Sequence, residues 1–281
     1  MIPCTTAGHF LRGRAGEIFL LVRSPPQPRG TVLVVPPFAE EMNKCRRMVT
    51  ETALELCSTG YAVLVPDLYG TGDSQGDFAD GRWGLWQEDL ETVCAWGEAN
   101  RLAVRAVLAV RLGAALAVSA ACNGRLPAVA ATAFWQPVLD GAKHLTQFLR
   151  LRTAGNLAGE GDKETVADLR AKLAAGQSVE VAGYGLAGDL ASELDALEQP
   201  TQLPSQLGAT HWMEVVRTPE GGLPATSKAT IERLQASGSR VSPHTFVGEP
   251  FWATVEISTV PEMIRATAQS LSAGVISTDE R

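Results

Sequence analysis

One arginine occupies the position at which this sequence pattern usually presents a nucleophile. The apolar run Arg105–Val110 ends at Arg111 and the small-residue segment Gly113–Ala117 follows at once, so a strand, a tight turn and a helix are expected. In a Gly-x-Ser-x-Gly turn the same geometry holds a reactive serine at the end of a sheet. Positions 109–113 read Ala-Val-Arg-Leu-Gly here. A guanidinium stays protonated and donates hydrogen bonds only, so it cannot attack a carbonyl carbon.

The arginine could still do chemistry of another kind. A guanidinium in the floor of a pocket binds a carboxylate or a phosphate through paired hydrogen bonds. Burying the cation alone would be costly, so it requires a carboxylate partner from the protein or from a ligand. The alternative is an ordinary arginine at a helix start, in contact with solvent.

The elements that must position Arg111 alternate between strands and helices. A loop is expected over 36–43, and a second loop, rich in glycine, over 67–76. Regular alternation of this length predicts an α/β protein with a mostly parallel sheet. The expected strands are 16–23, 31–35, 61–67, 105–110, 128–135, 209–216 and 239–247, and the expected helices are 48–58, 83–100, 226–237 and 261–272, followed by a frayed tail over 275–281.

Bulk composition excludes some classes of partner. The chain has 281 residues, 45% of them hydrophobic and 20% charged, with a formal charge of −7. Such an acidic protein lacks the basic face that nucleic acid requires, so no nucleic-acid partner is expected. The longest apolar stretch, 102–122, is interrupted by Arg105 and Arg111, so no membrane span is expected either. No signal peptide is visible at the N-terminus.

The cysteines and histidines are scattered. The five cysteines show no C-x-x-C spacing, which favours reduced thiols and a cytoplasmic location over a disulfide framework or a zinc site. The four histidines are equally dispersed, and no metal or cofactor is expected. The residues concerned are Cys4, Cys45, Cys57, Cys94 and Cys122, and His9, His144, His211 and His244.

Three segments together, 32–43, 67–74 and 105–117, resemble the α/β-hydrolase superfamily. More closely, the chain is similar to the proteins called exosortase A system-associated hydrolase 2. This resemblance implies an α/β-hydrolase fold with a helical lid, and a bacterial context of exopolysaccharide production and protein sorting by exosortase. The motifs that carry the likeness are Pro36–Lys44, Gly76–Asp80, Arg111–Ala114, Val181–Tyr184 and Pro250–Trp252.

The implied organisation has three parts. Residues 1–141 form the first part of the α/β-hydrolase core. The regular alternation stops over 142–203, where mainly helical segments are inserted, and these form the lid. Residues 204–281 complete the core.

The resemblance also allows a test for a Ser-His-Asp triad. The acid is expected after strand 209–216, where Glu220 is the only nearby carboxylate. The histidine is expected in the loop 248–252, which contains none, and His244 lies several residues too early. With Arg111 in place of serine, two of the three members are missing and the third is doubtful.

Carboxylates near the expected site are candidates to pair with Arg111. Glu40 is favoured, because it lies in the loop that supplies an oxyanion-hole N–H in working enzymes, and Glu41 and Glu249 come next. Arg111 and Glu40 are thus the candidate catalytic residues. The candidate ligand-binding residues are Phe38, Ala39, Glu41, Arg111, Leu112, Glu249 and Trp252.

Two functions remain open. In the first, the protein binds a small anionic, acyl or saccharide ligand, or a partner protein, beneath the lid, with Arg111 as the anchor. In the second, it hydrolyses esters or thioesters by an unusual route, in which Glu40, Glu41 or Asp67 activates a water and Arg111 stabilises the oxyanion. The sequence indicates no oligomeric state.

Overall fold

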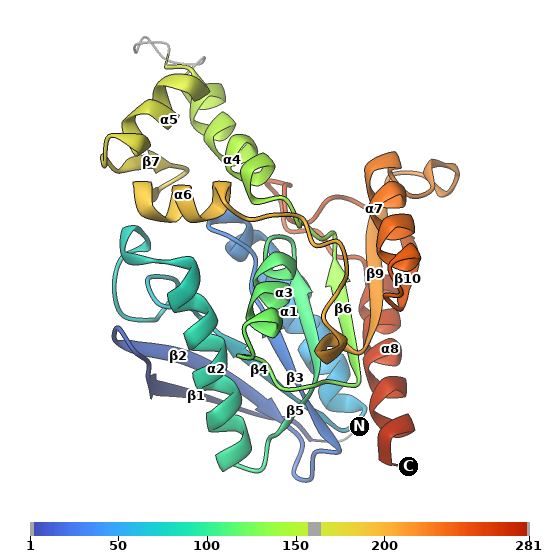
Figure 1. Cartoon of the computed structure of the whole chain (residues 1–281). Helices are drawn as coiled ribbons and strands as arrows, with labels where there is room; N and C mark the ends of the chain where they lie inside the picture. Colours follow the sequence, from blue (N-terminus) through green and yellow to red (C-terminus); the bar gives the residue numbers. More distant parts are fainter. Residues whose placement is uncertain (1–2, 157–163, 280–281) are drawn as a thin grey trace.

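A sheet of eight strands runs through the centre of the protein (Figure 1). The structure is a computed structural model that describes residues 3–156 and 164–279. Strand order is β1-β2-β4-β3-β5-β6-β9-β10; the pairs β1/β2 and β2/β4 are antiparallel and the others are parallel, which confirms the expected mostly parallel sheet. The strands are β1 Thr5–Arg12, β2 Glu17–Ser24, β3 Gly30–Val35, β4 Tyr61–Pro66, β5 Val104–Val110, β6 Ala131–Trp135, β9 Ala209–Val216 and β10 Val241–Val247.

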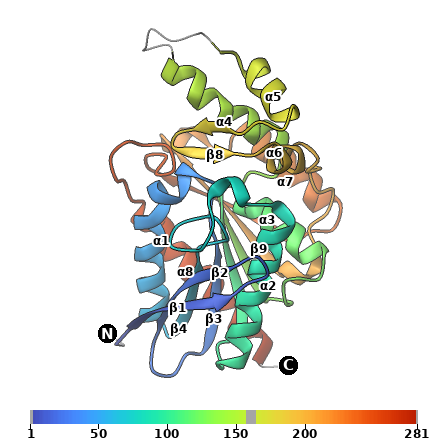
Figure 2. The ribbon, with the colours of Figure 1, turned by 90° about the vertical axis from the view of Figure 1, so that its left-hand side faces the viewer.

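Helices cover both faces of the sheet, which is why the central strands are almost continuously apolar. On one face, α1 (Glu40–Ser58) and α8 (Pro261–Asp279) pack against one apolar cluster. On the other, α2 (Trp83–Ala99), α3 (Gly113–Cys122) and α7 (Ala225–Ala236) contribute to a second (Figure 2). Within the described ranges 3–156 and 164–279, no helix is long and apolar enough to cross a bilayer.

The chain between β6 and β9 lies over one end of the sheet (Figures 1 and 2). It is tied to α2 by hydrogen bonds from Arg82 Nη2 to Asp189 Oδ2 (3.0 Å) and from the Trp83 N–H to Glu193 Oε2 (2.7 Å). Both contacts hold this segment over that end of the sheet. Its elements are α4 Gly141–Asn156, α5 Val166–Ala174, the hairpin β7 Val179–Val181 and β8 Tyr184–Leu186, and α6 Gly188–Asp195.

Some expected boundaries are wrong. The predicted loop over 36–43 is shorter, because α1 already begins at Glu40, where two acidic residues in its first turn favour the helix N-terminus. The sequence does not indicate strand β1, because this exposed edge strand has no strong apolar pattern. The expected frayed tail is helical as far as Asp279, since α8 continues past its predicted end; residues 280–281 lie outside the described chain.

The expectation of five reduced thiols is also wrong. Cys4 and Cys57 form a disulfide that joins the chain just before β1 to the end of α1. The two residues are 53 positions apart, so spacing along the sequence gave no sign of the pairing. The cytoplasmic expectation rested on reduced thiols, and the disulfide removes that support. The free cysteines among the described residues are Cys45, Cys94 and Cys122.

Candidate functional site

Arg111 lies in the turn between β5 and α3 with a backbone φ of 55°. This left-handed conformation is uncommon for a residue other than glycine and points to a constrained turn. The turn packs closely on the end of β3: a Cβ atom on Gly113 would lie 2.5 Å from the Pro36 carbonyl oxygen and 2.6 Å from that of Val35. The retained glycine at 113 is therefore required by a backbone contact.

The Arg111 side chain is only 12% exposed and is held from several directions. Its Nε and Nη2 atoms lie 3.0 and 2.9 Å from the same oxygen, Oε1 of Glu41. Its Nη1 donates to the Gln136 carbonyl oxygen at 3.0 Å. The alternative of a solvent-exposed helix-start arginine is therefore wrong.

Glu41, and not the favoured Glu40, is the partner of Arg111. Consecutive residues of a helix point about 100° apart, so the start of α1 at Glu40 allows only one of the two carboxylates to face Arg111. Burial raises the pKa of Glu41, and the charge of Arg111 opposes that rise. Burial also raises the pKa of Glu40, whose Oε2 atom is buried without a hydrogen-bond partner among the described residues.

The loop after β10 places Trp252 above Arg111. The guanidinium carbon lies 5.0 Å from the centre of the indole ring, which is a cation–π contact. Glu249, the third candidate partner in the same loop, is exposed, and so is Glu220 after β9. The His244 ring lies 3.2 Å (Nε2 to Nδ1) from His211 on the neighbouring strand. No serine or cysteine within 3–156 and 164–279 hydrogen-bonds to a histidine.

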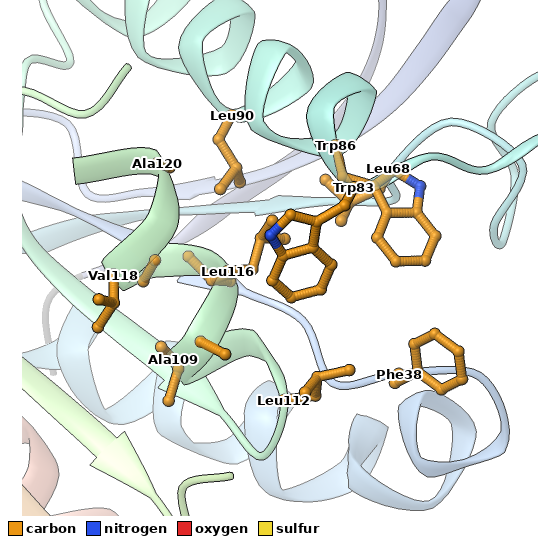
Figure 3. Packing of buried hydrophobic residues seen from close by; sticks show 14 of the residues in the cluster. Phe38, Leu68, Trp83, Trp86, Leu90, Ala109, Leu112, Leu116, Val118 and Ala120 are labelled. Atoms are coloured by element: carbon orange, nitrogen blue, oxygen red, sulfur yellow. The ribbon is translucent and has the colours of Figure 1, made fainter. Parts of the chain in front are cut away.

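Phe38, Ala39 and Leu112 lie on the apolar side of the turn. Ala39 has a φ of 48°, so the loop before α1 is as constrained as the turn at Arg111. In Figure 3 the indole rings of Trp83 and Trp86 project from α2 toward Leu112 and Phe38. These side chains leave a cavity of only about 20 Å³. All three predicted residues therefore pack as an apolar wall.

A larger and more polar cleft also borders the β5–α3 turn. Its volume is about 630 Å³, and Arg111 contributes to its lining. The walls come from the loop after β6, from the start of α4 and from α7, and they include Asp140, Lys143 and Arg233. Of the candidate residues, only Arg111 lines this cleft.

His144 is a residue near the site that sequence reasoning missed. Its side chain is 4% exposed, and its ring lies 5.4 Å, edge to face, from that of Phe38. Burial, together with the charge of Arg111, lowers the pKa of the imidazole to about 3. Neither ring nitrogen has a hydrogen-bond partner in the described chain. The sequence carried no signal for this contact, because it depends on how the segment above the sheet packs.

A buried network extends from Arg111 to β9. Gln136, which accepts from Arg111 through its carbonyl oxygen, has a φ of 41° and donates from Nε2 to Glu214 Oε2 at 3.2 Å. Glu214 also accepts from Trp212 Nε1 at 2.7 Å. Trp212 lines the polar cleft, so this network fixes part of its wall.

Other residues whose types could act as nucleophiles or bind a metal lie in positions that favour a structural role. Burial raises the pKa of the Cys45 thiol, which disfavours a reactive thiolate. Asp67 Oδ2 accepts from the Asp73 N–H at 2.9 Å and thereby shapes the glycine-rich loop after β4. In the part of the chain that the structure describes, no three His, Cys, Asp or Glu side chains are grouped so that they could hold a metal ion.

Comparison with known proteins gives the fold. No protein-family model matches the chain, and no curated protein does. Among solved structures, Est1E from Butyrivibrio proteoclasticus with bound ferulic acid superposes with a TM-score of 0.66 at 14% identity, covering 96% of this chain and 99% of that one.

Two further structures support the same assignment. A thermostable carboxyl esterase from Bacillus coagulans, in complex with glycerol, gives a TM-score of 0.62 at 14% identity, covering 98% of this chain and all of the other (100%). An α/β serine hydrolase homologue from Coxiella burnetii gives 0.57 at 15% identity, covering 94% and 97%. At these identities the likeness is one of architecture. The chain therefore has the α/β-hydrolase fold.

Proposed function

We propose that this α/β-hydrolase-fold protein lacks a working Ser-His-Asp triad and binds a small ligand at the end of its sheet. The observation that carries the proposal is the Arg111–Glu41 pair in the strand–turn–helix position of a nucleophile. A guanidinium cannot form an acyl intermediate. Trp252 stacks on it from the loop in which the resemblance implies a histidine.

In this proposal, residues 142–203 form a lid over the site, between core segments 1–141 and 204–281. The contacts of Arg82 and Trp83 with α6 hold the lid against the core. Arg111, which lines the cleft, is the anchor for the ligand. The resemblance to exosortase-associated proteins suggests that the ligand comes from exopolysaccharide production or the sorting that accompanies it.

One observation favours a second candidate function, hydrolysis of an ester or thioester by an activated water. Burial raises the pKa of Glu40, which would make it a stronger base, and its Oε2 atom has no partner among the described residues. Neither Glu40 nor Glu41 lines the polar cleft, however. Binding without hydrolysis therefore ranks first.

Turnover of p-nitrophenyl acetate, p-nitrophenyl butyrate and an acyl thioester separates the two functions. We expect the wild-type protein to release no product above the buffer rate. Turnover that Glu40→Gln abolishes, with an unchanged circular dichroism spectrum, would instead establish the water-activation route. Lys228→Gln, on the exposed face of α7, is the matched control for a single substitution that leaves the site intact.

A further inference from the structure

Two spaces border the β5–α3 turn, one lined by Leu112 and the other by Arg111, and their sizes and polarities restrict the class of ligand. This inference rests on the proposed binding function. The apolar space between Phe38, Leu112, Trp83 and Trp86 measures about 20 Å³. About 10–15 Å³ of such space holds one water, so this space holds about one water, and an acyl chain of several carbon atoms needs several times more. The side chains around this apolar space are closely packed, so it cannot hold an acyl chain.

The polar cleft has ample volume for a small polar ligand, and most of its groups are hydrogen-bonding ones. Besides the charged residues, its walls carry the amides of Gln147 and Gln199 and the hydroxyls of Thr226, Ser227 and Thr230. Trp212, Val138 and Leu139 supply the apolar part. Planar amides and hydroxyls beside an aromatic residue suit a ligand with several hydroxyl groups.

The charges in the cleft favour an anion. Arg111, Lys143 and Arg233 line it, but the charge of Arg111 is already paired with Glu41. The remaining two cations face one carboxylate among the described lining residues, Asp140. Both Asp140 oxygens are already used, because Oδ1 accepts from the Lys143 N–H and Oδ2 from Gln199 Nε2, each at 2.8 Å.

Two of these cations lack a carboxylate partner. Lys143 and Arg233 make no ion pair with any residue that the structure describes. Arg233 instead donates to the neutral Gln199 Oε1 at 3.2 Å. A positive cleft of this kind on a chain of formal charge −7 attracts an anion locally, without making the whole surface attractive to polyanions.

We propose that the cleft between the start of α4 and α7 binds an acidic sugar, that is, a polyhydroxylated ring that carries a carboxylate or a phosphate. Lys143 and Arg233 bind the anionic group. The amides and hydroxyls of the walls bind the ring, and Arg111 lines the cleft. This narrows the anionic, acyl and saccharide ligands of the proposed function to a ligand that is both anionic and a saccharide.

Isothermal titration calorimetry with D-glucuronate, D-glucose 6-phosphate, D-glucose, inorganic phosphate and decanoate tests the proposal. At least one of the two acidic sugars should bind ten or more times more tightly than glucose and than inorganic phosphate. Which of the two is preferred identifies the anionic group. Lys143→Gln and Arg233→Gln should each weaken that binding about tenfold, because each removes one charged contact. Lys228→Gln removes the same charge from α7 outside the cleft and should leave the affinity unchanged.

Three results would overturn the proposal: no binding of either acidic sugar, equal binding of glucose or of free phosphate, or tighter binding of decanoate. Tighter binding of decanoate would still be compatible with a non-catalytic binding protein, so it rejects the ligand class alone. Ester turnover by the wild-type protein rejects the proposed function itself, whichever sugar binds.

Discussion

The two spaces that border the β5–α3 turn, one lined by Leu112 and the other by Arg111, differ in volume, polarity and packing. At the first, Phe38, Leu112 and Trp86 are buried and leave about 20 Å³; at the second, polar and charged side chains surround about 630 Å³. Under the proposed function, the packed apolar residues stabilise the fold and the cleft binds the ligand.

The largest effect is expected at Arg111, in the turn that both spaces border. Arg111→Ala leaves Glu41 buried without its cation and should lower the free energy of unfolding by about 4 kcal/mol. The double variant Arg111→Met, Glu41→Leu removes both charges and should recover most of that loss. Urea unfolding of Arg111→Met, Glu41→Leu and the double variant measures the coupling. Losses that simply add would show that the pair does not stabilise the turn.

The residues around the apolar space should respond to loss of volume. Phe38 contacts Phe78, Trp86, His144 and Phe148 through edge-to-face ring pairs, so Phe38→Ala should cost about 3 kcal/mol of unfolding free energy. The new cavity should also admit a small apolar ligand, such as benzene, and raise the melting temperature of the variant in its presence. Phe10→Ala is the control, because Phe10 is 60% exposed and should cost much less.

Burial of His144 makes the free energy of unfolding depend on pH. Its pKa is about 3 in the folded protein against 6.5 in a model peptide, so the unfolded chain takes up the proton first as the pH falls. This contribution to stability is complete above pH 6.5 and declines toward pH 3. Between pH 7.5 and 5 the wild-type protein should therefore lose about 2 kcal/mol more than His144→Phe. Parallel stability profiles of the two proteins would contradict the buried, neutral imidazole.

Substitutions in the cleft should have the smallest effects on stability. Lys143→Gln and Arg233→Gln remove exposed charges that pair with no carboxylate of the described chain, so each should change the free energy of unfolding by less than about 0.5 kcal/mol. Thermal unfolding at pH 7.5 measures this. A loss of unfolding free energy as large as that of Phe38→Ala would show that the cleft residues stabilise the fold. It would contradict the proposed difference between the apolar space and the cleft.

The sequence predicts the sheet and the turn better than it predicts the pairing within the site. Apolar runs such as 31–35 and the sequence 109–113 are local signals, and β3 and the β5–α3 turn follow them. The choice between Glu40 and Glu41 depends on where α1 begins, which shifted by eight residues from the predicted start at 48.

The other misses depend on tertiary contacts. The Cys4–Cys57 bond and the contact of the buried His144 with Phe38 each join segments that are far apart in the chain. No periodicity or spacing encodes such a contact. The cleft was missed for the same reason, because its walls come from the loop after β6, from α4 and from α7.

Labelling with a fluorophosphonate, followed by intact-protein mass spectrometry, tests the central claim most directly. Because Arg111 fills the nucleophile position, the wild-type protein should keep its unmodified mass under conditions that label a serine esterase to completion. A single adduct that maps to a serine beneath residues 142–203 would contradict the account.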